Sequence, residues 1–262
     1  QVLPVYKVIT INLNSGDNPA NAFTISSKAD FENLLKATYE GNTFADKYFK
    51  LTTDIYNLDL TSLGSNISSS FEGVLYAETQ KTISVSNLNS SIFATLKNAS
   101  IQNINFEFKN SDTGLNTSSL IANSITFDDG VDKTEKEDNI YRYGLRNINL
   151  TLNRNISTTN DFAVFTLSAT NAVFKDCSIT ITDGTQVECQ NFAGFVLNDE
   201  KGTYAHNILR LYGSASITSS AASVASSAVA AGLIKIAENS TISYSYVLAF
   251  DRSNVNIKSK DS

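Results

Sequence analysis

The sequence predicts an all-β protein folded as a parallel β-helix, a β-solenoid in which successive turns of chain stack on one another. Three observations predict it: a short strand motif recurs, a second element precedes most copies at a nearly constant distance, and the only two prolines lie near the N-terminus. Proline removes a donor from the strand ladder, so its absence elsewhere suits uninterrupted sheet. Each repeat has too few strands to bury its own apolar face, and stacking pools these faces into one core.

The recurring motif begins with an apolar residue, continues with two polar ones and then alternates apolar and polar positions. Its copies are Ile101–Phe108, Leu145–Leu152, Phe174–Ile181, a looser Tyr204–Leu211 and a degenerate Ile242–Phe250 that needs one inserted residue. Such alternation is typical of a half-buried strand.

The third position of the motif predicts a corner in the backbone. In the first copy, Ile104, Phe106 and Phe108 share one face, and Ile101 joins them only if the chain bends near Asn103. Asn, Asp and His tolerate such bends. The equivalent residues in the next three copies are Asn147, Asp176 and His206.

A second apolar element precedes four of the copies, at Ser91–Ala94, Phe162–Phe165, Phe192–Val196 and Ala230–Ile234. From its last aromatic residue or Leu to the start of the motif is eight residues in the first case and nine in the others. The full period varies from 29 to 44 residues, which predicts loops of different length around a constant core. The longest insertion contains Asp128–Asp138 and is expected to be a polar loop.

The N-terminal region reads as a cover for one end of the stack. We assign residues 1–48 to an N-terminal strand and capping helix, and residues 49–262 to one continuous parallel β-helix. Val5–Leu13 alternates as a strand does, and an amphipathic helix is expected near residues 28–39. Ser27 with Asp30 resembles a capping box, and Gly41 is a plausible residue after the helix end.

The C-terminal end has no comparable cover. It finishes with a strand-like Asn254–Lys258 and a polar tail, so the edge is either blunted by charge or meets another chain. The segment Gly213–Gly232, nearly all Ser, Ala and Val, is either a flexible loop or a tight interface.

Charge and hydropathy limit the partners. The net charge of −6 and the pI of about 4.9 argue against nucleic acid and anionic membrane surfaces. No stretch approaches the roughly 20 apolar residues of a membrane span, so no membrane insertion is expected. The chain starts at Gln1 and contains no Met, which fits a mature N-terminus after signal-peptide removal or a trimmed sequence.

Two further features fit a secreted, extracellular protein. Cys177 and Cys189 could close one short disulfide loop, or Cys177 could be a buried thiol with Cys189 unrelated to it. Consensus sites for N-glycosylation begin at seven asparagines: Asn66, Asn89, Asn98, Asn116, Asn149, Asn155 and Asn239.

A family resemblance follows from the segments Phe49–Ile55, Phe71–Leu75, Ala193–Val196 and Ala231–Ile234. Their order resembles the entry region and Gly-hydrophobic repeats of right-handed parallel β-helix proteins of the GLUG-motif and pectate-lyase-like type. The resemblance covers about residues 30–250 and departs from the pattern at Ala163-Val164 and Phe93-Ala94, where Gly is absent. It implies a right-handed winding and an adhesin-like surface role.

The sequence predicts no catalytic residue, no cofactor and no metal ligand. It lacks the carboxylate and Arg-x-Lys patterns of polysaccharide hydrolases and lyases. Asp128, Asp129 and Asp132 lack the full signature of a calcium loop. His206, the only histidine, falls at the corner position, and no nucleophile-elbow motif accompanies it.

We therefore expect a non-catalytic secreted module at the cell surface, structural or adhesive, that contributes to an extracellular filament or coat. Its partners would be itself, through end-to-end or lateral association, or other surface proteins and glycans. The alternative is a carbohydrate-binding or polysaccharide-degrading protein. The aromatic side chains available for sugar stacking, each equally explained by packing, are Tyr141, Tyr143, Tyr204, Tyr244 and Tyr246.

Overall fold

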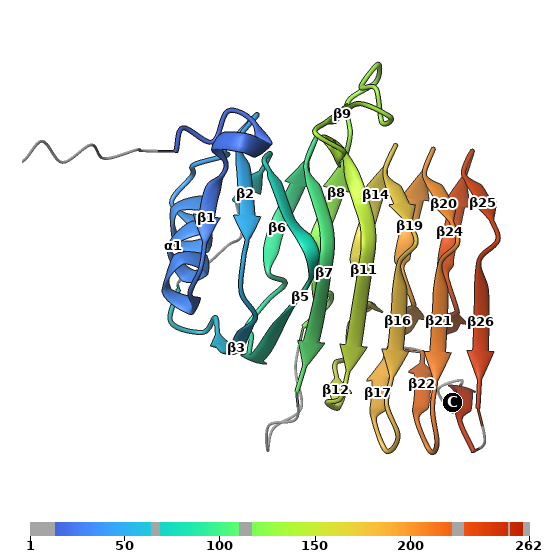
Figure 1. Ribbon diagram of the computed structural model, residues 1–262. Helices are drawn as coiled ribbons and strands as arrows, with labels where there is room; N and C mark the ends of the chain where they lie inside the picture. The colour runs from blue at the N-terminus through green and yellow to red at the C-terminus, as the bar shows by residue number, and fades with distance from the viewer. Residues whose placement is uncertain (1–13, 64–68, 110–116, 222–227, 251, 259–262) are drawn as a thin grey trace, which may run out of the picture.

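The computed structural model describes residues 14–63, 69–109, 117–221, 228–250 and 252–258. These residues form mainly parallel β-sheet, with one α-helix among them. The all-β class and the parallel pairing predicted from the sequence are therefore confirmed. Strands lie side by side in chain order from the blue N-terminal end to the red C-terminal end (Figure 1). The predicted strand Val5–Leu13 lies outside the described residues.

In the described part of the chain, the strands form four parallel sheets and one antiparallel hairpin. Sheet A contains β1 (Phe23–Ile25), β2 (Tyr48–Leu51), β3 (Ile55–Asp59), β5 (Val74–Asn87), β7 (Ser100–Phe108), β11 (Gly144–Leu152), β15 (Val173–Lys175), β16 (Ser178–Ile181), β20 (Thr203–Ala205), β21 (Ile208–Leu211), β25 (Thr241–Ser243) and β26 (Tyr246–Ala249). Sheet B contains β4 (Ser70–Phe71), β6 (Phe93–Lys97), β8 (Ala122–Thr126), β14 (Thr166–Thr170), β19 (Val196–Glu200) and β24 (Ile234–Glu238).

The remaining sheets are smaller. Sheet C contains β12 (Ile156–Ser157), β17 (Gln186–Cys189), β22 (Ser216–Ser220) and β27 (Asn254–Lys258). Sheet D contains β13 (Phe162–Ala163), β18 (Asn191–Ala193) and β23 (Val229–Ala231), and the hairpin pairs β9 (Lys136–Glu137) with β10 (Ile140–Tyr141). Thus β22 and β23 take up part of the Ser/Ala/Val-rich segment.

The motif copies predicted from the sequence lie in register with one another in sheet A. Leu150 lies opposite Phe106 and Ile179, and Ile179 lies opposite Leu209. The last copy needs no inserted residue, because Ile242 pairs with Tyr204 and every later pair keeps the same offset through Ala249. That detail of the prediction was wrong: the copy ends one residue earlier than Phe250.

The predicted corner is present in each of the first four copies. Asn103, Asn147, Asp176 and His206 have φ values of 57°, 50°, 56° and 57°. This left-handed conformation turns the chain between two short strands, and Asn and Asp adopt it more readily than most residues. A second corner column, which the motif analysis missed, consists of Asn98, Asn171, Lys201 and Asn239.

The second apolar element has a more constant spacing than the sequence suggested. In sheet B, Phe93 aligns through Ala122 with Thr166, and Thr166 aligns with Val196. Phe93, Thr166 and Val196 each lie eight positions before the first residue of the next motif copy, whereas Ala122 lies 23 positions before Leu145 because the longest insertion follows it. The spacings of nine are counted from the residue just before the aligned position, such as Phe165, which precedes Thr166.

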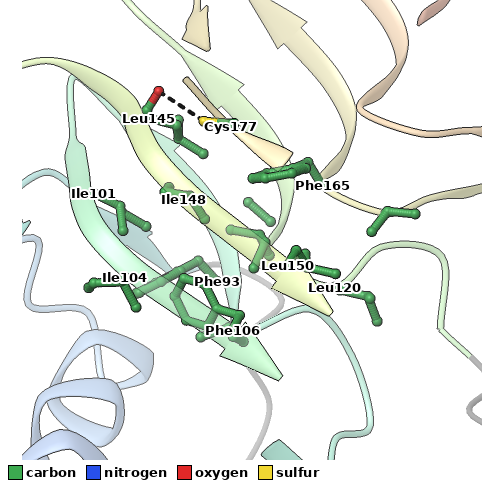
Figure 2. Packing of buried hydrophobic residues seen from close by; sticks show 14 of the residues in the cluster. Phe93, Ile101, Ile104, Phe106, Leu120, Leu145, Ile148, Leu150, Phe165 and Cys177 are labelled. Atoms are coloured by element: carbon green, nitrogen blue, oxygen red, sulfur yellow. Dashed lines mark hydrogen bonds between the residues drawn. The ribbon is translucent and has the colours of Figure 1, made fainter. Parts of the chain in front are cut away.

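One continuous hydrophobic core lies inside the stack. Figure 2 shows residues of β7 and β11, including Ile104, Phe106 and Leu150, together with Phe93 and Phe165 in this cluster. Phe165 stacks on Phe195 with ring centres 5.0 Å apart, so aromatic residues also align along the stack.

A helix covers the N-terminal end, as predicted. The helix α1 (Lys28–Tyr39) packs Phe31, Leu34 and Leu35 into the core. The Ser27 hydroxyl accepts the Asp30 N–H at 3.2 Å, and the Asp30 carboxylate accepts the Ser26 N–H at 2.9 Å. Strand β1, which precedes α1, pairs in register with β2, so the ladder of sheet A begins before residue 49.

The C-terminal end of the described stack is more exposed. Ile242 and Val247 are 47% and 48% exposed, whereas their in-register neighbours Tyr204 and Leu209 are 1% exposed. Within the described ranges, β23–β27 form the last layer, and no other described strand pairs with their outer edge.

Candidate functional site: a cationic cluster around Tyr141

Part of the longest insertion folds back on the outer face of sheet A as a short hairpin. Its hairpin β9–β10 places Ile140 against Tyr48, Val74 and Tyr76, which form a small hydrophobic cluster outside the main core. The Tyr48 hydroxyl donates to Glu137 at 2.9 Å. The predicted polar loop is present at residues 128–135, which are mostly exposed, but it ends in a short hairpin because Ile140 packs on the aromatic side chains of Tyr48 and Tyr76.

A buried glutamine fixes the position of Tyr141. The Gln102 amide donates to the Tyr141 carbonyl oxygen at 2.5 Å, and its oxygen accepts the Tyr141 N–H at 3.1 Å. This side chain thus pairs with the backbone of β10 much as another strand would. Gln102 is in register with Arg146, and Arg146 is in register with Lys175.

Two cationic side chains lie against the Tyr141 ring, and a third, Lys175, lies on the neighbouring strand. The Arg146 guanidinium carbon lies 3.8 Å from the centre of the Tyr141 ring, and the Lys136 ammonium lies 4.2 Å from it. These two charges are therefore no more than about 8 Å apart. Lys175 follows Arg146 on the neighbouring strand, at the roughly 4.8 Å spacing between strands.

The local field is positive. The pKa of Tyr141 is lowered, first by a hydrogen bond from Lys136 and further by the charges of Arg146, Lys136 and Lys175. Burial lowers the pKa of Arg146, as expected for a half-buried cation. Cation–π contact with the ring offsets part of the cost of burying the guanidinium.

These cations lack close carboxylate partners among the described residues. No described carboxylate oxygen lies within 4.0 Å of the nitrogen atoms of Lys136, Arg146 or Lys175. Arg146 donates instead to the carbonyl oxygen of Lys133 at 2.8 Å.

Two acidic groups lie near these cations, and the charge of Asp176 acts on Arg146. Glu135 pairs with Arg142 at 3.5 Å, and Asp176 lies 3.2 Å from Nδ1 of His206. The three cations still dominate the field at Tyr141, whose pKa is lowered, on a protein whose net charge is −6.

The other aromatic candidates are placed differently. Tyr204 is buried and stacks on Phe174, so it cannot meet a sugar. Tyr143 packs edge-on against Phe127, and Tyr244 and Tyr246 are exposed in the last layer, at 69% and 54%. Only Tyr141 combines partial exposure with the cationic cluster among these five residues.

The other polar candidates form no catalytic constellation in the described residues. His206 occupies a corner, where its ring lies against the Asp176 carboxylate and the Tyr244 ring. Asp128 accepts a hydrogen bond from Asn98, and Asp132 accepts two from Thr134. Within the described ranges, no three His, Cys, Asp or Glu residues are close enough to hold a metal ion.

The two cysteines are separate free thiols in this structure, so the disulfide allowed by their spacing is not formed here. Cys177 lies in the core and donates to the carbonyl oxygen of Leu145 at 3.4 Å (Figure 2). Cys189 is buried in β17. Burial raises the pKa of both thiols to about 12.

The glycosylation sites differ in accessibility. Asn89, Asn155 and Asn239 are exposed, while Asn98 and Asn149 are partly buried and their amides are hydrogen-bonded. Asn66 and Asn116 lie outside the described residues. Whether any site carries a glycan stays a prediction.

No protein-family model matches this chain, and searches of curated proteins and of solved structures found no match. The resemblance to GLUG-motif and pectate-lyase-like proteins thus stays a hypothesis. The single helix in the described ranges has 12 residues, too few to cross a bilayer.

Proposed function

We propose that this chain is a right-handed parallel β-helix that serves as a non-catalytic, secreted structural or adhesive module at the cell surface. The proposal rests on one observation: successive copies of the repeat stack in register around a continuous core, while their outward residues differ. Such a surface presents side chains at fixed spacing along its length. The right-handed sense follows the strong preference of parallel crossover connections.

Several features support an extracellular surface role. Asn89, Asn155 and Asn239 are accessible to glycosylation, and the acidic pI of about 4.9 suits a soluble, well-hydrated surface. Self-association, end to end or lateral, belongs to the same proposal, as do contacts with other surface proteins or glycans.

Labelling intact cells with an antibody, before and after permeabilisation, tests the location. We expect equal signal in both, together with loss of mass on enzymatic deglycosylation. A signal that requires permeabilisation would overturn the surface role. Sedimentation over a range of concentrations tests self-association, and a monomer throughout would remove it.

The second candidate is a carbohydrate-binding or polysaccharide-degrading protein, favoured by the position of Tyr141 beside Arg146 and Lys136. Incubation with acidic and neutral polysaccharides separates the two candidates. The main proposal predicts that no polymer is shortened. Robust depolymerisation that a single substitution abolishes would favour the enzyme.

A further inference from the structure

The geometry points to an acidic-glycan site on the outer face of sheet A: Lys136, Arg146 and Lys175 bind a carboxylate or sulfate group of the glycan. This inference names the ligand of the proposed adhesive surface, and it rests on that proposal. The shared chemistry is an oxyanion, which guanidinium and ammonium groups recognise through charge-assisted hydrogen bonds.

Two of the three cations, Arg146 and Lys136, are held in place before any ligand arrives. The Gln102 side chain fixes the backbone of Tyr141, and the Tyr141 ring lies against both Arg146 and Lys136. Arg146 is further held by the carbonyl oxygen of Lys133. Preorganised groups lose little conformational entropy on binding, which favours affinity.

A column of polar groups runs beside the cations. The corner residues Asn147 and Asp176 directly follow Arg146 and Lys175 in the sequence, and both are exposed. The Asn147 amide donates to Asn103 and one Asp176 oxygen lies beside His206. The Asn147 side-chain oxygen and the second Asp176 oxygen can accept hydrogen bonds from hydroxyl groups. A ligand that carries acid groups and hydroxyls on adjacent positions, as an acidic sugar does, matches both columns.

Other polyanions fit less well. Nucleic-acid binding draws on many phosphate contacts, whereas this cluster offers three cations on an acidic protein. An acidic peptide supplies carboxylates but lacks the hydroxyls that the corner column would bind. The observations therefore favour a glycan over either alternative.

The test measures binding of the full chain by calorimetry at low salt. The probes are polygalacturonate for carboxylate, dextran sulfate for sulfate, neutral dextran and poly-glutamate. We expect one or both acidic glycans to bind, neutral dextran not to bind, and poly-glutamate to bind at least about tenfold more weakly. Polygalacturonate against dextran sulfate identifies which oxyanion is preferred.

Substitutions locate the site. Arg146→Gln should weaken binding about tenfold, the value for one hydrogen bond to a charged group. Lys175→Gln, which removes no hydrogen bond or ion pair identified among the described residues, should weaken it about threefold. The matched control is Arg210→Gln, an exchange of a partly buried arginine in β21 of the same sheet, away from Tyr141.

A spectroscopic readout accompanies the binding data. A bound anion offsets the positive field, so the pKa of Tyr141 should rise when the glycan saturates the protein. The difference between wild type and Tyr141→Phe in an ultraviolet titration isolates this tyrosine.

Three results would overturn the inference: no acidic glycan binds at low salt, poly-glutamate binds as tightly as the glycans, or Arg210→Gln weakens binding as much as Arg146→Gln. Each leaves the surface location untouched. Conversely, an intracellular location with intact glycan binding would remove the proposed function and keep the site.

Discussion

The corner at Asn147 allows a test of the backbone geometry that the repeat imposes. Its φ of 50° lies in the left-handed region, and its amide donates to the Asn103 side chain at 2.9 Å. Replacing Asn147 with Val changes both features. Replacing it with Gly removes the hydrogen bond and relieves the backbone.

The unfolding free energies of the two variants should differ only by the cost of holding the residue in the left-handed backbone conformation. A left-handed conformation costs an L-residue about 1–2 kcal/mol, and β-branched residues tolerate it worst. Loss of the hydrogen bond costs at most about 1 kcal/mol, because Asn147 is exposed. We expect Asn147→Val to lose about 2–3 kcal/mol and Asn147→Gly to stay within about 1 kcal/mol of the wild type.

Urea unfolding followed by far-ultraviolet circular dichroism measures these free energies. Thr151→Val is the matched control, since Thr151 is an outward residue in a strand of the same repeat. It should change stability by less than about 0.5 kcal/mol. Equal losses for the Val and Gly variants would refute the claim that backbone strain at the corner governs the cost.

Three more predictions follow from the structure. Cys177 and Cys189, with pKa values raised to about 12 by burial, should resist a thiol reagent at pH 8 until urea unfolds the protein. Fewer than two reactive thiols in the urea-unfolded protein, without reductant, would contradict free cysteines. Gly194→Ala should lower the unfolding free energy by about 3 kcal/mol, because the added Cβ would lie 2.0 Å from a carbonyl oxygen of the next repeat. At Gly184 an added Cβ meets no atom, so Gly184→Ala should cost about 1 kcal/mol, and similar losses for the two variants would exclude close packing as the cause. Hydrogen bonds from Thr61 and Asn87 lower the pKa of Asp59, so its carboxylate stabilises the fold above about pH 4 and loses that effect as the pH falls through its folded pKa. Asp59→Asn should therefore flatten the dependence of the unfolding free energy on pH in this range, and an unchanged dependence would contradict the assignment.

Much of the fold could be predicted because its signals are local. The alternation after Asn103 and Asn147 fixes which face of each strand is buried, and the same spacing recurs in each repeat. Ser27 and Gly41 mark the two ends of α1 through their own hydrogen bonds and backbone preference. The offset of the last copy was missed because Leu248 and Phe250 mimic the apolar positions that Val247 and Ala249 occupy.

The candidate site was only partly visible in the sequence. Tyr141 was selected for its ring, and the repeat alignment would have placed Arg146 beside Lys175, since both hold the second motif position. The position of the hairpin could not be inferred, because Gln102 and Tyr141 are 39 residues apart and alternation says nothing about what covers an outer face.

By itself, the sequence determined the repeating strands, the corners and the covering helix, because each depends on preferences that act over a few residues. Only the tertiary structure decided that the hairpin of the charged insertion packs on Tyr48 and Tyr76 and that Arg146 and Lys136 meet at Tyr141. It also decided that Cys177 and Cys189 are buried as separate thiols. The physical reason is that these contacts join residues far apart in the chain, whose meeting depends on loop lengths and on the packing of the whole stack.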